Sequence, residues 1–288
     1  MKSALNAKTQ PARAAHESMG KAHSLVLFLF VLLCTPLTQA DSIRQPTIAI
    51  IVDDMGHHYR HGRELIELPY PLTLAFLPHR KHTEALSKLA HEHGKEIMLH
   101  APMQTIDGIR LGDGALTDTM SEHEIKQSLL ASLDSIPYVR GINNHMGSHL
   151  TAQNHAMRWV MEALQSKPVY FVDSRTSPQS VAARMASRYQ IPNLTRDVFL
   201  DHHQTRKFVQ QQFLKLIKMA RERGTAVAIA HPHRVTIDYL RFALPRLDER
   251  GIKIATASAL WQIRHPQQRM FAHRETNQRL ALNEQKDR

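Results

Sequence analysis

Short apolar runs alternate with longer helix-like segments from Pro46 to about Leu260, and this alternation limits the possible folds more than any other feature of the chain. Several runs are apolar at successive positions, as in strands that are covered on both faces. Strand–helix alternation over about 210 residues predicts a parallel sheet or a (β/α) barrel. The strand-like runs are Thr47–Val52, Leu72–Leu77, Glu96–Leu99, Val139–Ile142, Val169–Val172, Val198–Leu200, Ala226–Ala230 and Ile252–Ala257.

The segments between these runs carry helix signals. Ser121–Leu133 opens with Ser-Glu-His-Glu, the pattern of a capping box. Gly94, Gly224 and Gly251 each precede a strand-like run, as glycines often do after the end of a helix. Without an internal repeat or a clear linker, we predict one α/β barrel domain over residues 41–264, with seven or eight parallel strands, in preference to two small domains. Further helices are predicted at Thr151–Gln165, Ser177–Tyr189, Thr205–Arg223 and Thr236–Glu249.

The two ends of the chain differ in composition from this domain. Residues 1–40 combine a basic start, an apolar run from Leu25 to Cys34 and a Thr38-Gln39-Ala40 end, which is typical of a secretory signal peptide. The apolar run is shorter than the roughly 20 residues that a membrane span needs, although an uncleaved anchor is the alternative. We therefore predict a periplasmic or secreted protein that contacts a membrane only through this segment. Residues 265–288 are rich in Gln, Arg and Glu and are predicted to be an exposed or disordered tail.

The composition excludes several classes of protein. The single cysteine, Cys34, lies in the signal segment, which excludes a disulfide scaffold, a zinc finger and an iron–sulfur protein. A metal would have to be held by carboxylates and by some of the 20 histidines. The formal net charge of +11 indicates a mildly basic protein or one attracted to an anionic polymer or membrane surface. No basic block is interleaved with aromatic residues, so nucleic acid is not an expected partner.

Acidic and imidazole side chains follow most of the predicted strands. The carboxyl ends of parallel strands meet at one rim, where α/β proteins bind their ligands. Any one of these residues could be an ordinary solvated side chain, but their recurrence after separate strands predicts a common site. They are Asp53, Asp54, His100, His145, Asp173, Arg175, Asp201 and His231.

Asp53 and Asp54 are the most informative of these residues. Adjacent carboxylates repel each other, and burying both without a partner is unfavourable. A bound cation would offset the repulsion and burial cost for one carboxylate and leave the other free to act as a base. The alternative is that the pair begins a helix, where Asp is favoured. His145 and His149 would share one face if their segment were helical. No glycine-rich phosphate loop, His-Glu-x-x-His pattern or nucleophile elbow occurs. Hydrolysis at an oxygen-rich metal site is the predicted chemistry.

Six blocks of the chain resemble, in order, the motifs of the divergent polysaccharide deacetylase family. They are Ile50–Gly56, Pro71–Pro78, Glu96–Met103, Gly141–Ser148, Phe171–Thr176 and Arg196–Asp201. The resemblance covers about residues 46–260 and implies a distorted (β/α) barrel related to the polysaccharide deacetylases. It also implies removal of N- or O-acetyl groups from polysaccharides with a divalent metal, often zinc.

The resemblance also implies roles for individual residues. It makes Asp53 the general base, Asp54 a metal ligand and His231 the general acid. The better-studied deacetylases hold the metal through His-[Ser/Thr]-x-x-His, and this chain departs from that pattern. His145 and His149 keep the spacing without the Ser or Thr, and Gln104 stands in the fourth place after His100. We favour Asp54, His100 and His145 as ligands, with His149 in reserve. The predicted substrate-binding residues are Asn144, Asp173 and Arg175.

The predicted function is an exported metal-dependent hydrolase that removes acetyl groups from a polysaccharide or peptidoglycan-type glycan. One alternative is a catalytically inactive carbohydrate-binding or interaction protein on the same fold, because a fold does not determine a function. Another alternative is a glycosidase that uses two carboxylates.

Overall fold

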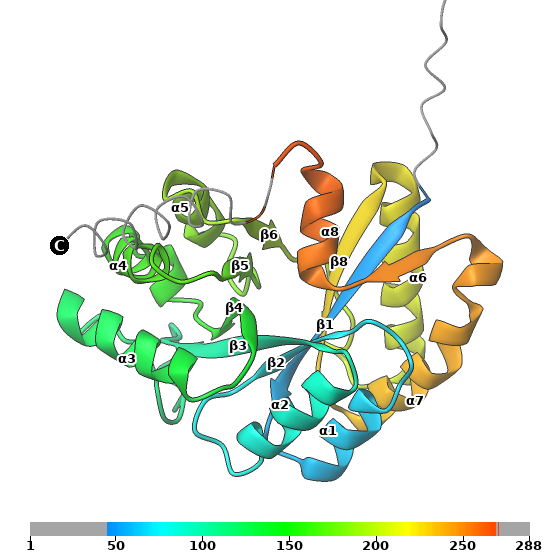
Figure 1. Cartoon of the computed structure of the whole chain (residues 1–288), viewed down its shortest axis with the longest axis horizontal. Coiled ribbons are helices and arrows are strands. Elements are labelled where there is room, and N and C mark those ends of the chain that lie inside the picture. Colours follow the sequence, from blue (N-terminus) through cyan, green and yellow to red (C-terminus); the bar gives the residue numbers. More distant parts are fainter. Residues whose placement is uncertain (1–44, 269, 271–288) are drawn as a thin grey trace, which may run out of the picture. The chain divides into compact units, whose positions relative to one another are not determined.

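A computed structural model describes residues 45–268 and residue 270 as an α/β fold built on one parallel sheet. The strands follow the order β6-β5-β4-β3-β2-β1-β8-β7, with β9 beside the start of β1 (Figure 1). The predicted signal peptide and most of the predicted tail lie outside the described residues. The strands are β1 (Thr47–Met55), β2 (Thr73–Phe76), β3 (Glu96–Met103), β4 (Val139–Met146), β5 (Tyr170–Asp173), β6 (Asn193–Thr195), β7 (Val198–Phe199), β8 (Thr225–Ala230) and β9 (Lys253–Ala255).

The sheet curls into an incomplete barrel, which confirms the predicted distorted (β/α) barrel. Its two edge strands, β6 and β7, are separated in the chain by Arg196 and Asp197 alone. The backbone N–H of Arg196 donates to Asp173 on one side of this gap, and that of Asp197 donates to Val227 on the other. The barrel is therefore joined at this seam by the chain itself, without direct pairing between β6 and β7.

Eight helices are described, and seven of them share the outer core of the sheet. Residues Ile48, Ile50 and Val52 of β1 face this core, whereas Ala49 and Ile51 face a second core together with α8. This alternation along β1 is the period of two expected of a strand. None of the described helices has the length and apolar character needed to cross a bilayer. The helices are α1 (Tyr59–Ile66), α2 (Thr83–Glu92), α3 (Glu122–Asp134), α4 (Asn154–Leu164), α5 (Ala182–Arg188), α6 (Arg206–Arg223), α7 (Arg234–Ala243) and α8 (Ala257–Arg264).

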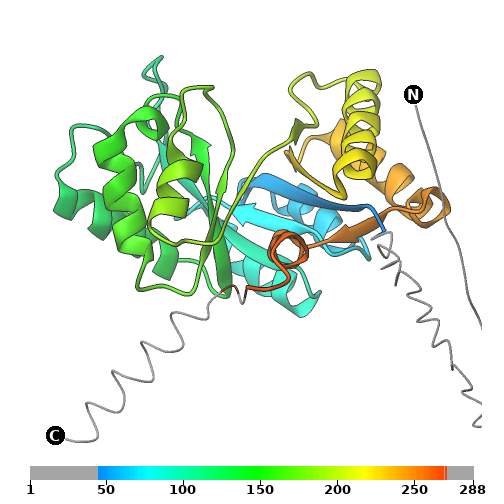
Figure 2. The ribbon, with the colours of Figure 1, turned by 90° about the horizontal axis from the view of Figure 1, so that it is seen from above.

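Helix α8, seen end-on in Figure 2, packs on the inner face of the sheet and bonds residues at the amino ends of the strands. Glu96, which begins β3, accepts hydrogen bonds from the backbone N–H of Ser258 and from the hydroxyl of Tyr170, which begins β5. At the other end of α8, Arg264 donates to the hydroxyl of Thr225, which begins β8. We call the bonds to Glu96 the Glu96 clamp. It holds the start of α8 against the end of the barrel opposite the carboxyl ends of the strands.

Most predicted elements occur, and the differences have local causes. The capping box at Ser121 is confirmed, since its side chain and that of Glu124 cap each other's backbone N–H groups. The predicted strand Ile252–Ala257 is too long because Thr256 caps α8 by accepting from Ala259. The predicted helix Thr236–Glu249 is also too long. Helix α7 gives way to short 3-10 helices at Leu244–Arg246 and Asp248–Arg250, where Pro245 lacks the N–H that an α-helix needs.

Gly141 in β4 provides a test of this packing. A Cβ atom at Gly141 would lie 2.5 Å from Cζ of Tyr170, whose hydroxyl belongs to the Glu96 clamp. Gly141→Ala should therefore destabilise the fold by about 1–3 kcal/mol, as overpacking typically does. Urea unfolding would measure the change, and Tyr170→Leu should reduce the effect because it shortens the opposing side chain. An unchanged free energy of unfolding in Gly141→Ala would contradict this account.

Candidate metal centre

Asp53 and Asp54 lie inside β1, near its carboxyl end, and not at the start of a helix. Neighbouring residues in a regular strand point to opposite faces. Here the pairing of β1 with β2 shifts between Val52 and Met55, and Asp54 has a φ of 55°. This irregularity allows both carboxylates to approach the same imidazole. Nε2 of His100 lies 3.6 Å from Asp53 Oδ2 and 3.3 Å from Asp54 Oδ1.

Three potential ligand atoms converge beside this irregularity. Nδ1 of His145 lies 3.1 Å from Asp54 Oδ1 and 3.0 Å from His100 Nε2. Tetrahedral zinc with bonds of about 2.0–2.1 Å separates its ligands by about 3.3 Å, so the spacing is suitable. Asp54 Oδ1 is buried and has no hydrogen-bond partner within the described part of the chain. An unpaired buried carboxylate oxygen is unfavourable, and a cation would remove this penalty. The residues present therefore fit a divalent metal.

Asn143 links Asp53 to His100, and it was not among the residues selected from the sequence. This buried amide donates from Nδ2 to Asp53 Oδ1 over 2.7 Å, and its Oδ1 lies 2.7 Å from His100 Nδ1. Because an amide oxygen only accepts, His100 carries its proton on Nδ1 and keeps the lone pair of Nε2 for a metal. The available signal was strand periodicity, which places Asn143 on the same face as His145, two residues later.

His231 reaches the centre from the loop after β8 and is oriented by Asp201. Asp201 Oδ1 lies 3.0 Å from His231 Nδ1, and Asp201 Oδ2 accepts from the His231 backbone N–H and the Thr236 hydroxyl. His231 Nε2 then lies 4.0 Å from Asp54 Oδ2. Burial lowers the pKa of His231, but the Asp201 hydrogen bond and the nearby carboxylates outweigh it and raise the pKa to about 9. The protonated form of His231 is therefore favoured.

The two adjacent carboxylates have different protonation chemistry. Burial raises the pKa of Asp53 above its ordinary value, despite the opposing charges of His100 and His231. Burial also opposes ionisation of Asp54, but the adjacent imidazoles of His100 and His145 hold the Asp54 pKa far below its ordinary value. Such a separation favours a ligand role for Asp54 and a base role for Asp53.

Two of the predicted substrate-binding residues are occupied in building the rim. Asn144 donates to the carbonyl of Met146 and accepts from the backbone N–H of Ser174, so its amide joins two loops. The Asp173 carboxylate is buried and accepts from the backbone N–H of Arg175 and from the hydroxyl of Ser180. These bonds shape the β5–α5 loop. Arg175 alone of the three has an exposed side chain.

His149 does not join the ligand atoms. Its Nε2 lies 2.7 Å from Asp118 Oδ2. His145 and His149 do not share a helical face, because His145 belongs to strand β4. The chain turns directly afterwards, through positive φ angles of 54° at Met146 and 87° at Gly147. This turn directs the two imidazoles to different partners.

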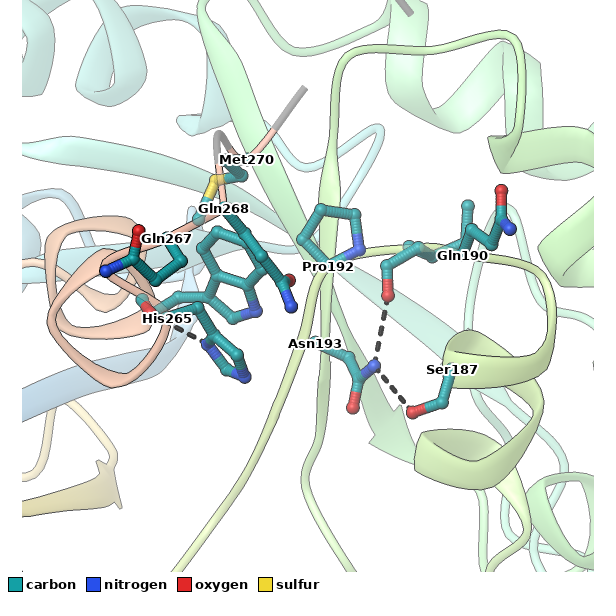
Figure 3. Close-up of a pocket in the computed structure, with 10 residues that line it drawn as sticks. Ser187, Gln190, Pro192, Asn193, His265, Gln267, Gln268 and Met270 are labelled. Carbon is teal, nitrogen blue, oxygen red and sulfur yellow. Dashed lines mark hydrogen bonds between the residues drawn. The ribbon is translucent and has the colours of Figure 1, made fainter. Parts of the chain in front are cut away.

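A cavity of about 610 Å³ lies at the other end of the barrel (Figure 3). Its lining includes Pro192 and Asn193, at the amino end of β6, and His265, just after α8. Trp261 also lines it but is only 5% exposed and stacks against His265, with ring centroids 4.5 Å apart. The indole face is therefore covered and offers little surface for stacking on a sugar. The candidate metal centre lies away from this cavity, around Asp54 at the carboxyl ends of the strands.

Comparison with known proteins identifies the family. A sequence model of the divergent polysaccharide deacetylases matches residues 50–261. An uncharacterized protein from Haemophilus influenzae is 34% identical over 233 residues, covering 81% of this chain and 83% of that protein. The crystal structure of an uncharacterized protein from Agrobacterium tumefaciens C58 has a TM-score of 0.73 at 25% identity, covering 75% of this chain and 89% of that one. A peptidoglycan N-acetylglucosamine deacetylase shares the fold, with a TM-score of 0.51 at 13% identity, and covers 76% of this chain and 90% of its own. The chain belongs to the divergent polysaccharide deacetylase family.

Proposed function

We propose that this protein is an exported zinc-dependent deacetylase that removes acetyl groups from a cell-envelope glycan of the peptidoglycan type. The observation that carries the proposal is the convergence of Asp54 Oδ1, His100 Nε2 and His145 Nδ1 within 3.0–3.3 Å of one another. Family membership supports the acetyl chemistry. The glycan class follows the structural neighbour that deacetylates peptidoglycan, and export rests on the signal-like residues 1–40.

Asp54, His100 and His145 would hold the cation. When bound, a divalent cation at this position supplies a Lewis acid that polarises the acetyl carbonyl and makes a nearby water more acidic. Nitrogen and carboxylate ligands in this number suit zinc in a catalytic site, where three protein ligands leave a position open.

The side chains around the ligands would carry out the proton transfers. Asp53 takes a proton from the attacking water, and its raised pKa favours that role. His231 donates a proton from Nε2 to the leaving nitrogen or oxygen. Asp201 holds the His231 ring in place and stabilises its charged form. Arg175, exposed after β5, is the substrate contact that we retain from the three predicted.

Metal analysis and acetate release together test this function. The purified protein should contain one tightly bound zinc and release acetate from acetylated peptidoglycan fragments. A chelator should stop the release, and zinc should restore it. His145→Ala should lose the zinc, whereas the control His149→Ala should keep it because His149 bonds Asp118 instead.

Other results would favour the alternatives. A folded, metal-free protein that binds glycan without releasing acetate would favour the inactive carbohydrate-binding protein. Shortened glycan chains that keep their acetyl groups would favour a glycosidase.

A further inference from the structure

Asp201, His231 and His233 form another group of potential ligands on the same rim. One donor atom from each lies within 4.8 Å of the others. We propose that these three residues bind a second divalent cation, more weakly than the first centre, and that its binding inhibits the deacetylase. The inhibitory part of this inference rests on the proposed function, whereas the cation site itself does not.

The local geometry supports a shared cation. His231 and His233 flank Pro232 before α7, and their rings stack at an interplanar angle of 28° with centroids 5.6 Å apart. Asp201 Oδ1 and His231 Nδ1 lie 3.0 Å apart and share a hydrogen bond, so a cation held between them would replace the proton on Nδ1. Asp201 is buried while both imidazoles are partly exposed, so a cation can enter from solvent.

The surrounding charges decide the relative affinity. Asp54 lies close enough to act electrostatically on both His231 and His233, which favours a cation beside them. However, Asp201 Oδ2 already accepts two hydrogen bonds, from the His231 backbone and from Thr236. His233 is also the N-cap of α7, and the positive end of a helix dipole disfavours a cation. The second site should therefore bind a cation more weakly than the first.

Occupation of the second site would weaken His231 as a proton donor. As a general acid, His231 gives up the proton on Nε2 and keeps the one on Nδ1 that faces Asp201. A cation on Nδ1 displaces that second proton, so loss of the Nε2 proton would leave an anionic ring. Proton donation then becomes unfavourable, and excess zinc should slow the release of acetate.

Isothermal titration calorimetry of zinc binding to the metal-free protein tests the site without reference to activity. The wild-type protein should bind one zinc tightly and a second zinc more weakly. His233→Ala should keep the tight zinc-binding event and lower the affinity of the second at least about 10-fold. His145→Ala should lose the tight event and retain the weak one. The control His202→Ala should bind like the wild type, since His202 lies against Phe199 and His203, outside the ligand group.

Two results would overturn the second site: a single binding event in the wild-type protein, or a His233→Ala titration identical to that of the wild type. Inhibition is measured separately, as acetate release at rising zinc concentration. Release should fall at excess zinc in the wild-type protein and stay constant in His233→Ala. An active wild-type enzyme that binds two zinc ions without losing activity would overturn the inhibitory role. A protein without any acetate release would contradict the proposed function and leave the two-event titration as the test of the site.

Discussion

Asp53→Asn is expected to lower the rate of acetate release roughly 100- to 10,000-fold, the usual contribution of a general base. Asparagine has nearly the shape of aspartate, and its side-chain oxygen can still accept the 2.7 Å hydrogen bond from Asn143. It cannot take a proton from water. Because Asp54 and not Asp53 is the proposed ligand, the variant should keep its zinc.

The measurements are the rate of acetate release, the zinc content and the urea unfolding midpoint. Asp53 is almost fully buried, so removing its charge should leave the free energy of unfolding unchanged or raise it. Asp118→Asn is a matched control, because that carboxylate bonds His149 away from the centre. Full activity in Asp53→Asn would exclude Asp53 as the base, and loss of zinc would make it a ligand.

The Asn143 variants should separate zinc binding from catalysis. Asn143→Ala removes both 2.7 Å contacts, to Asp53 and to His100. Zinc affinity should then fall about 10- to 100-fold, the usual effect of losing a residue that orients a ligand. Asn143→Asp keeps an acceptor for His100 Nδ1 but adds a third carboxylate beside Asp53 and Asp54. That variant should therefore retain zinc while losing most of its turnover.

Zinc competition with a chromogenic chelator and the steady-state kcat and KM would measure these effects. The neighbouring Asn144→Ala is the control, since Asn144 ties Met146 to Ser174 and does not contact the ligands. It should lower the unfolding midpoint and leave the zinc affinity near the wild-type value. If the zinc affinity of Asn143→Asp fell as far as that of Asn143→Ala, the hydrogen bond to His100 would not be what maintains the affinity.

The strands of this fold could be predicted because they are buried on both faces and appear as continuous apolar runs. Strand β6 escaped prediction because Asn193-Leu194-Thr195 contains one apolar residue and is defined by its pairing with β5. Helix α8 escaped prediction because it is short and packs on the inner face of the sheet. Such packing depends on tertiary contacts that a local pattern does not encode.

The residues that converge at the centre could be selected because charged and imidazole groups at strand ends stand out in a sequence. Asn143 is neutral and lies between Ile142 and Asn144 in β4, and its two bonds in the structure place it between Asp53 and His100. The direction that the chain takes after each strand was harder to predict. It depends on single residues with positive φ, such as Met146 and Arg175, which turn the chain away from the course that the spacing of residues in the sequence suggests.

The Glu96 clamp at the amino end of the barrel has a practical consequence for protein engineering. Its bonds to Ser258 and Tyr170 stabilise the scaffold at the pole opposite Asp54. In barrel proteins, residues at the amino ends of the strands commonly stabilise the fold, whereas residues at the carboxyl ends carry the active site. Thermostabilising substitutions around α8 can therefore be combined with loop exchanges around Asp54, with little interference between the two sets of changes.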